Sequence, residues 1–239
     1  MSISPNERSG EPGIFLMRRH GWFQRAAMGV PKKPTTGDRG PVRDALLDVI
    51  DAAGGLEFSR GELLRVIGIA QEEYSSLLPG VASSVPHYPA VPHLWGGATV
   101  PAVYYAFFET ATWTRAVIDR FEKPLCLAVQ PHDQLFWNSL QRIRSVSGGK
   151  VFDDARTLAG VSLHRYSPPY AGCGAKVVDR KLIYPVVDTV PVLNAVGDQA
   201  DFRNYLKFNE GRHAEMLVEE YWKAVYIFID KVLDEFYPK

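Results

Sequence analysis

The sequence has little of what marks several large classes of protein. It has only two cysteines, Cys126 and Cys173, without CxxC spacing, which argues against a disulfide scaffold or a zinc module. Its 27 basic and 27 acidic side chains cancel, so the long-range attraction to phosphate that is typical of dedicated nucleic-acid binders is missing on average. These absences favour a reducing compartment, and we expect a soluble, cytoplasmic protein.

Long hydrophobic runs are also missing. The longest clean run near the N-terminus, IFLM at 14–17, is too short for the core of a signal peptide, and no stretch approaches the length of a membrane span. We therefore expect no membrane contact. What is present is 46% hydrophobic and 12% aromatic content in 239 residues, which is enough for a substantial core in one large domain or in one domain with a smaller companion.

Proline and glycine divide the first part of the chain. Residues 1–40 are interrupted by both, which predicts an extended arm that Phe15, Trp22 and Phe23 anchor on the domain or on a partner. Residues 41–84 show apolar residues at helical spacing between glycine-containing breaks. This pattern predicts three short helices that resemble a helix-turn-helix unit.

A DNA-reading helix-turn-helix needs basic or amide side chains on its second helix. In this chain the corresponding stretch offers Gln71 followed by Glu72 and Glu73, and two glutamates repel phosphates. The sequence therefore favours packing or protein contacts for this unit over DNA reading.

The second part of the chain begins after a proline-rich linker. Residues 85–101 contain four prolines and a glycine pair, which excludes a regular helix and marks a domain boundary. Residues 102–239 then show helical spacing in four segments and two β-rich runs around Asp179, which predicts a hairpin. The expected helices are 102–121, 132–146, 151–164 and a long closing helix at 211–237.

The expected fold class is therefore mainly α. It is a helical bundle with a small β-hairpin insertion, preceded by a small three-helix unit and an extended N-terminal arm. In the closing helix, apolar residues at helical spacing form a wide arc, so this helix must be flanked on more than one side. We expect it to be central to the core.

An Arg and a His lie near the end of one expected helix, in RTLAGVSLHRYSPP at 156–169. With the order of elements over residues 100–237, this resembles the HEPN family of helical domains. The resemblance implies a cytoplasmic binding or regulatory protein linked to RNA in stress or defence. In active HEPN ribonucleases the Arg and His lie four to six residues apart and face the cleft of a dimer, so the resemblance also implies a homodimer.

The resemblance makes Arg156 and His164 the candidate catalytic pair, and Arg165 and Tyr166 the candidate contacts to a phosphate or a base. An Arg stabilises negative charge that develops on a phosphate, while a His moves protons at the 2′-hydroxyl or the leaving oxygen. Arg156 and His164 are eight positions apart, which on a helix is about 80° of rotation and about 12 Å of rise. The alternative is structural: Arg156 neutralises a neighbouring aspartate and His164 ends the helix.

Metal and nucleotide sites have no support in the sequence. The histidines lack HExxH or His-carboxylate spacing, and GCGAK at 172–176 lacks the full phosphate-loop pattern, so we expect no metal and no cofactor. Three functions remain open. The chain is a binding or regulatory protein for RNA or a protein partner, a metal-independent endoribonuclease, or a structural subunit of a larger assembly.

Overall fold

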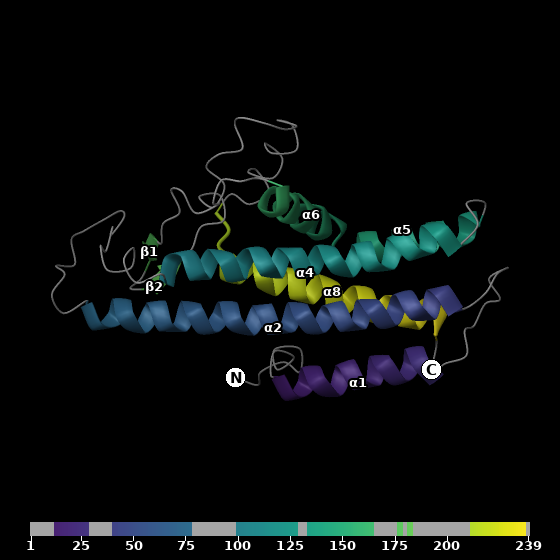
Figure 1. Ribbon diagram of the computed structural model, residues 1–239, viewed down its shortest axis with the longest axis horizontal. Helices are drawn as coiled ribbons and strands as arrows, with labels where there is room; N and C mark the ends of the chain where they lie inside the picture. Colours follow the sequence, from purple (N-terminus) through teal and green to yellow (C-terminus); the bar gives the residue numbers. More distant parts are fainter. Residues whose placement is uncertain are drawn as a thin grey trace. The chain divides into compact units, whose positions relative to one another are not determined.

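The computed structural model of the chain is mainly α-helical, as the sequence predicts (Figure 1). It describes residues 12–28, 40–77, 99–128, 133–164, 176–178, 181–183 and 211–237. In these ranges no helix is both long enough and apolar enough to cross a membrane. The elements are α1 (Pro12–Met28), α2 (Gly40–Leu77), α4 (Thr99–Ala128), α5 (Gln134–Val146), α6 (Gly149–His164), β1 (Lys176–Val178), β2 (Lys181–Ile183) and α8 (Ala214–Phe236).

The chain forms two compact units, each assembled from segments far apart in the sequence. Unit 1 comprises Met1–Gly55, Ala116–Lys150 and Lys223–Lys239, and unit 2 comprises Leu56–Arg115 and Val151–Trp222. The helices α2, α4 and α8 each contribute residues to both units. The sequence instead predicts a boundary and a non-helical linker at 85–101. Residues 99–101 of this linker belong to α4, which corrects the prediction there, and 85–98 lie outside the described residues.

The extended arm expected at residues 1–40 contains a helix, α1, and this corrects the prediction. Pro12 suits the first helical position, where its missing N–H has no intrahelical acceptor. Phe15 and Trp22 are buried as predicted, whereas Phe23 is 51% exposed. A short isolated helix is only marginally stable, and packing against the rest of unit 1 stabilises α1. The helix therefore forms in spite of the glycines within it. Residues 1–11 and 29–39 lie outside the described part.

The three short helices expected over 41–84 are also wrong for the part that the structure describes. α2 is one helix of 38 residues, so its residues do not form a helix-turn-helix. The glycine pair at 54–55 costs about 1 kcal/mol per residue relative to alanine, but it does not end the helix because buried residues surround it. The absence of a side chain at Gly54 leaves room for the end of Arg19, because a Cβ at this position would lie 3.0 Å from Cζ of Arg19. Residues 78–84 lie outside the described ranges.

The later helices agree better with their patterns. α5 begins where Asp133 caps it, with Oδ1 accepting from the Phe136 backbone N–H at 3.1 Å. Phe136, Leu140 and Ile143 of α5 are buried at helical spacing, whereas Leu135 is 81% exposed. α4 extends to Ala128, beyond the end at 121 that the sequence predicted.

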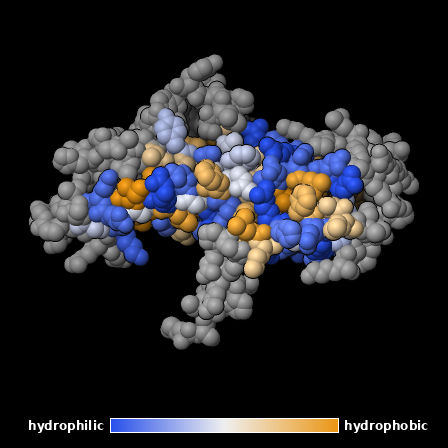
Figure 2. All heavy atoms as spheres, turned by 60° about the horizontal axis from the view of Figure 1, so that its bottom comes forward, coloured by the Kyte–Doolittle hydropathy of each residue, from blue (hydrophilic) through white to orange (hydrophobic). Residues whose placement is uncertain are grey.

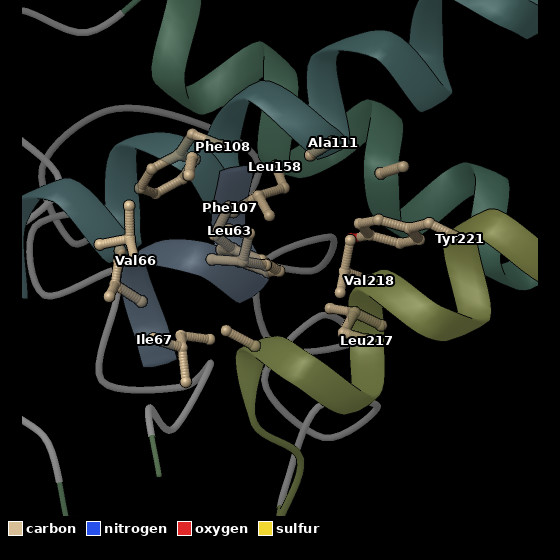
Figure 3. Close-up of a cluster of buried hydrophobic side chains, with 14 of the residues drawn as sticks. Leu63, Val66, Ile67, Phe107, Phe108, Ala111, Leu158, Leu217, Val218 and Tyr221 are labelled. Atoms are coloured by element: carbon tan, nitrogen blue, oxygen red, sulfur yellow. The ribbon is translucent and has the colours of Figure 1, made fainter. Parts of the chain in front are cut away.

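The core of unit 2 gathers side chains from four helices (Figure 3). Phe107 of α4 and Tyr221 of α8 stack with ring centroids 6.4 Å apart, and Leu158 of α6 is buried in the same cluster. The Tyr221 hydroxyl donates to Oδ2 of the buried Asp154 at 2.8 Å. The polar end of this buried aromatic ring is therefore satisfied inside the core.

The closing helix α8 is central to the core, as predicted. Its unit 1 residues Val225, Phe228 and Val232 are fully buried at the spacing that the sequence showed. Phe228 meets the ring of Phe121 edge-on at 5.4 Å. Burial around α8 extends beyond one stripe, because Tyr226 and other residues outside that stripe are also buried.

The strands β1 and β2 pair in antiparallel register, with Val177 opposite Leu182. The Leu182 side chain belongs to the unit 2 core, and its backbone N–H donates to Oε1 of Gln71 at 2.8 Å. Residues 179–180 between the strands lie outside the described residues, so the hairpin turn stays a prediction.

Candidate functional site

The predicted catalytic pair lies on one continuous helix. α6 contains both Arg156 and His164, so the separation of about 80° and about 12 Å that helix geometry implies applies within one chain. Arg156 is partly buried, while the side chain of His164 lies outside what the structure describes. The predicted binding residues Arg165 and Tyr166 also lie outside the described residues. The proposed pairing of the two catalytic side chains stays a prediction.

Any RNA cleavage by the purified chain is expected to need Arg156 and His164 together and to continue in a chelator, since the proposed proton transfers need no metal. Replacing either residue with alanine should remove most of the activity. Lys150→Ala, at the exposed start of the same helix, is the control. Cleavage that a chelator abolishes, or that survives Arg156→Ala, would contradict this assignment.

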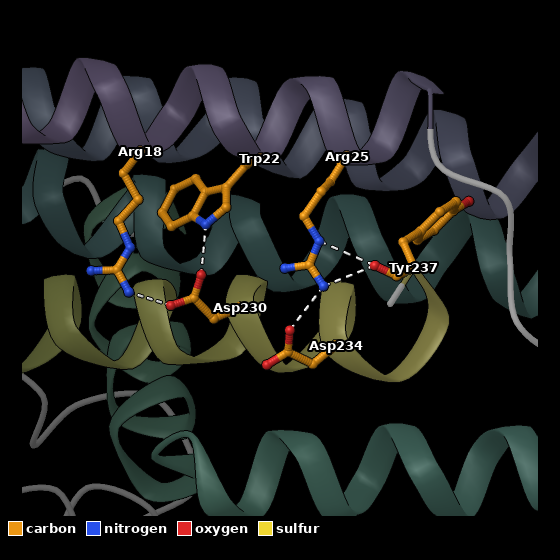
Figure 4. A network of polar contacts seen from close by, with 6 residues as sticks. All are labelled: Arg18, Trp22, Arg25, Asp230, Asp234 and Tyr237. Atoms are coloured by element: carbon orange, nitrogen blue, oxygen red, sulfur yellow. Dashed lines mark hydrogen bonds and ion pairs between the residues drawn. The ribbon is translucent and has the colours of Figure 1, made fainter. Parts of the chain in front are cut away.

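The most developed polar arrangement in the described residues joins α1 to the last turns of α8 in unit 1 (Figure 4). The indole N–H of Trp22 donates to Oδ1 of Asp230 at 2.7 Å. Arg18 donates to the other carboxylate oxygen of Asp230, and its guanidinium lies over the Tyr226 ring with Cζ 5.1 Å from the centroid. One carboxylate therefore accepts from two side chains of α1, and both donors also contact buried aromatic surface.

One turn further along, Arg25 fixes the other end of α1. Its guanidinium donates to Oδ1 of Asp234 at 2.8 Å and to the backbone carbonyl of Tyr237 at 2.8 Å and 3.1 Å (Figure 4). The carbonyls at the end of a helix have no intrahelical donor, and the helix dipole favours a cation there. Arg25 thus closes the C-terminal end of α8 while it holds α1.

A groove of about 390 Å³ lies along this contact. The charged side chains of α1 and α8 line it together with Trp22 and Gly21. A Cβ at Gly21 would meet nothing within 4 Å, so the glycine leaves its side of the groove open. The inner face of α1, which we define as Phe15, Arg18, Trp22, Arg25 and Ala26, therefore meets α8 through a small apolar contact and a row of paired charges.

The sequence predicted burial of the aromatic residues of α1 but not their acceptors. Asp230 and Asp234 are four residues apart between apolar positions of α8, so sequence alone presents them as the polar side of an amphipathic helix. The only available signal was the absence of any acidic residue in 12–28, which contains three arginines. That excess requires acidic partners elsewhere but does not identify them.

A third arginine of α1 contacts α2. Arg19 donates to Oδ1 of Asp51 at 2.9 Å and lies against Gly54. Asp44, Asp48 and Asp51 follow one another at helical spacing on α2, and all three are exposed. The acidic side of α2 therefore lies next to the side of α1 that carries Arg19.

The apolar arc of α1 is wider than the surface that unit 1 covers. At about 100° per residue, Trp22, Phe15 and Ala26 fall within about 40° of one another. Arg19 follows them on the helix surface, and beyond it Phe23, Leu16 and Ala27 continue the arc to a total of about 140°. The first three are buried, whereas Phe23 is 51% and Leu16 is 61% exposed. In Figure 2, which brings the bottom of Figure 1 forward, hydrophobic residues form separate groups among hydrophilic ones. We call Leu16, Phe23 and Ala27 the outer side of the arc.

Unit 2 contains a second arrangement of tryptophan, carboxylate and arginine. The indole N–H of Trp222 donates to Glu57, and Arg60 lies over the Trp222 ring with Cζ 4.8 Å from the centroid. Arg60 also donates to Oε1 of Glu219 at 2.8 Å. Arg60 and Glu57 are nearly buried, so this cluster joins α2 to α8 within unit 2 through one guanidinium that two carboxylates share.

Stability should depend on the ionisation of Glu57. Burial raises the pKa of this carboxyl above 4.5 and repulsion by Glu219 adds to the effect, while Arg60 and the Trp222 N–H lower it less. The pKa of Glu57 is higher in the folded than in the unfolded chain, so its protonated form stabilises the fold. This contribution to the free energy of unfolding is fully present below pH 4.5 and is lost as the pH rises through the folded pKa. The stability of the wild type relative to Glu57→Gln should therefore fall between acidic and neutral pH in urea unfolding. An equal difference at both pH values would contradict this.

Metal ligands are not gathered in the part of the chain that the structure describes, where no group of three or more His, Cys, Asp or Glu side chains is placed to hold an ion. His87, His93 and His132 lie outside that part.

Comparison with known proteins gives no relative: no protein-family model, curated protein or solved structure matches the chain. The resemblance to the HEPN family therefore stays a prediction from the sequence. Any functional assignment depends on the geometry of the chain itself.

Proposed function

We propose that this chain is a binding protein, and that the outer side of the α1 arc contacts a protein partner. The observation that carries the proposal is the half-covered apolar arc of α1. Its inner face is fixed by Trp22, Arg18 and Arg25, while Leu16 and Phe23 remain exposed beside it. An arc of about 140° is wide enough for a second packing partner, and large exposed apolar groups beside a fixed helix are typical of interaction surfaces.

The charges beside the outer side favour a protein over RNA. Arg19 is already paired with Asp51, and the neighbouring Asp44 and Asp48 are exposed on α2. The arginines at this edge are paired with its aspartates, since Arg43 pairs with Asp44 and Arg120 as well as Arg19 with Asp51. A phosphate backbone therefore meets little net positive charge there, whereas the exposed Asp48 suits the basic flank of a helix with an apolar face. The partner class that fits is therefore an amphipathic protein segment with lysine or arginine beside its apolar residues.

The test is the native size of the tagged chain in extracts of the cells that make it. The wild type should migrate in a larger assembly, and Leu16→Gln with Phe23→Gln should shift it to the size of the free chain, because a polar side chain placed in an interface core loses its hydration. The matched control is Met17→Gln with Met28→Gln, which changes two residues of α1 that are 76% and 81% exposed but lie outside the arc.

The outcomes separate the candidate partners. A protein partner is supported if the assembly of the wild-type chain keeps its size after ribonuclease treatment and the outer-side variant migrates at a smaller size. Collapse of the assembly on ribonuclease treatment would instead support an RNA partner, as the HEPN resemblance implies. A wild-type chain that migrates as a free monomer would reject the proposal.

A further inference from the structure

The inner face of α1 makes a set of contacts that is small and separable from the rest of unit 1. It buries three apolar side chains, those of Phe15, Trp22 and Ala26. Its ion pairs are partly solvated: Asp234 is 68% exposed at the side chain, and Arg18 and Asp230 are 39% and 33% exposed. Exposed ion pairs contribute roughly 0–1 kcal/mol each, so most of the free energy that docks α1 on unit 1 comes from the aromatic contact.

The surface beneath α1 is specific in spite of this small area. Asp230 accepts from an arginine and from a tryptophan four residues later, and Asp234 accepts from a second arginine three residues after that. The Tyr226 ring lies one turn before Asp230 on α8, with the Trp22 ring edge-on at 4.8 Å. This surface therefore recognises a helix with Arg, Trp and Arg at spacings of four and three, flanked by an aromatic residue one turn earlier.

The helix with this pattern in the chain is α1 itself, and every copy of the protein carries one. The segment between α1 and α2, residues 29–39, has eleven residues, which fully extended span at most about 36–40 Å. The α1 helix is roughly 25 Å long, so exchange requires two copies to lie close enough for this connection to span the distance between them. An α1 helix docked on a second copy would make the same contacts as one docked on its own chain. The ratio of exchanged dimer to monomer therefore depends on protein concentration and on the length of the segment between α1 and α2.

We propose that the α8 side of this groove, Asp230 and Asp234 with the neighbouring Tyr226 ring, takes the α1 helix of a second copy of this chain, so that two copies exchange their first helices. The exchange uses the inner face of α1, so it is independent of the partner proposed for the outer side. Dimers formed in this way should increase with concentration and should leave Leu16 and Phe23 available.

Two full-length variants with reversed charges test this directly. The helix-reversed variant carries Arg18→Asp and Arg25→Asp, and the groove-reversed variant carries Asp230→Arg and Asp234→Arg. In each variant alone, α1 faces like charges in every copy, so both should be monomers of 26.7 kDa by light scattering after size exclusion. Mixed in equal amounts, they restore opposite charges in trans only, and the mass should double.

The control is one chain with all four substitutions, in which opposite charges meet again in cis. It should behave as the wild type does, with α1 amides protected from hydrogen exchange. At about 100 μM, an association of −5 to −6 kcal/mol becomes detectable. If the mixture stays monomeric at this concentration while the α1 amides of the fourfold variant are protected from hydrogen exchange, α1 docks only in cis.

A second measurement covers reversed variants that fail to fold. Trp22→Ala weakens the hold on the chain's own α1 and leaves the groove intact. A labelled peptide of residues 12–28 should bind this full-length variant at least tenfold more tightly than the same peptide with Arg18→Asp and Arg25→Asp. Equal binding of the two peptides would overturn the proposal.

Discussion

Replacing Phe228 with alanine is expected to lower the free energy of unfolding by about 3–5 kcal/mol, which is the usual cost of removing a buried phenylalanine ring. The side chain is 1% exposed and packs edge-on against Phe121 in the core of unit 1. The loss combines the transfer free energy of the ring with a cavity that the neighbouring side chains fill only in part. Chemical unfolding followed by circular dichroism measures it.

The adjacent residue gives a matched control. Ile227 is 42% exposed on the same helix, so Ile227→Ala should cost less than about 1 kcal/mol. If Phe228→Ala also costs less than about 1 kcal/mol, the buried stripe of α8 does not stabilise the protein in the way that its packing indicates.

Trp22→Ala should have an effect of similar size, but confined to α1. The indole is 3% exposed, donates to Asp230 and meets Tyr226 edge-on. Its removal is expected to lower the free energy of docking of α1 on unit 1 by about 3–5 kcal/mol. Detachment of α1 without global unfolding limits the loss that a melting curve reports. Hydrogen exchange of α1 amides should therefore accelerate by about 10² to 10⁴-fold, while unit 2 amides change little.

Phe23 is the control for this second substitution because it is the next residue on α1 and is 51% exposed. Phe23→Ala should leave the exchange of α1 within a factor of about three of the wild type. Equal acceleration by both substitutions would mean that the buried indole is not what holds the helix.

Periodicity predicted most of the helices because it depends on a single helix and its own solvent boundary. The closing helix is the clearest case, since Leu217, Tyr221 and Phe228 are buried at the spacing that the sequence showed. The same reasoning failed at Gly54, where local propensity predicts an end but α2 continues because Ala52, Ala53 and Leu56 beside it are buried. The segments that bury them lie elsewhere in the sequence, so this stretch alone carries no signature of the continuation.

The candidate site was less predictable than the fold for the same reason. Trp22 stood out as an aromatic residue that needed burial, yet nothing in its neighbourhood indicates Asp230 as its acceptor. Arg156 and His164 stood out because a family resemblance drew attention to them. The polar contacts that the structure describes most fully join residues more than 200 positions apart, a distance at which no sequence pattern operates.

The long separation between Trp22 and Asp230 has a consequence for synthesis on the ribosome. The two residues are 208 positions apart, and at 5–20 residues per second about 10–40 s pass between their incorporation. During that interval Phe15 and Trp22 have been translated but the surface that buries them has not. Docking of α1 is therefore a late folding step, because α1 must wait for the last turns of α8 to be made.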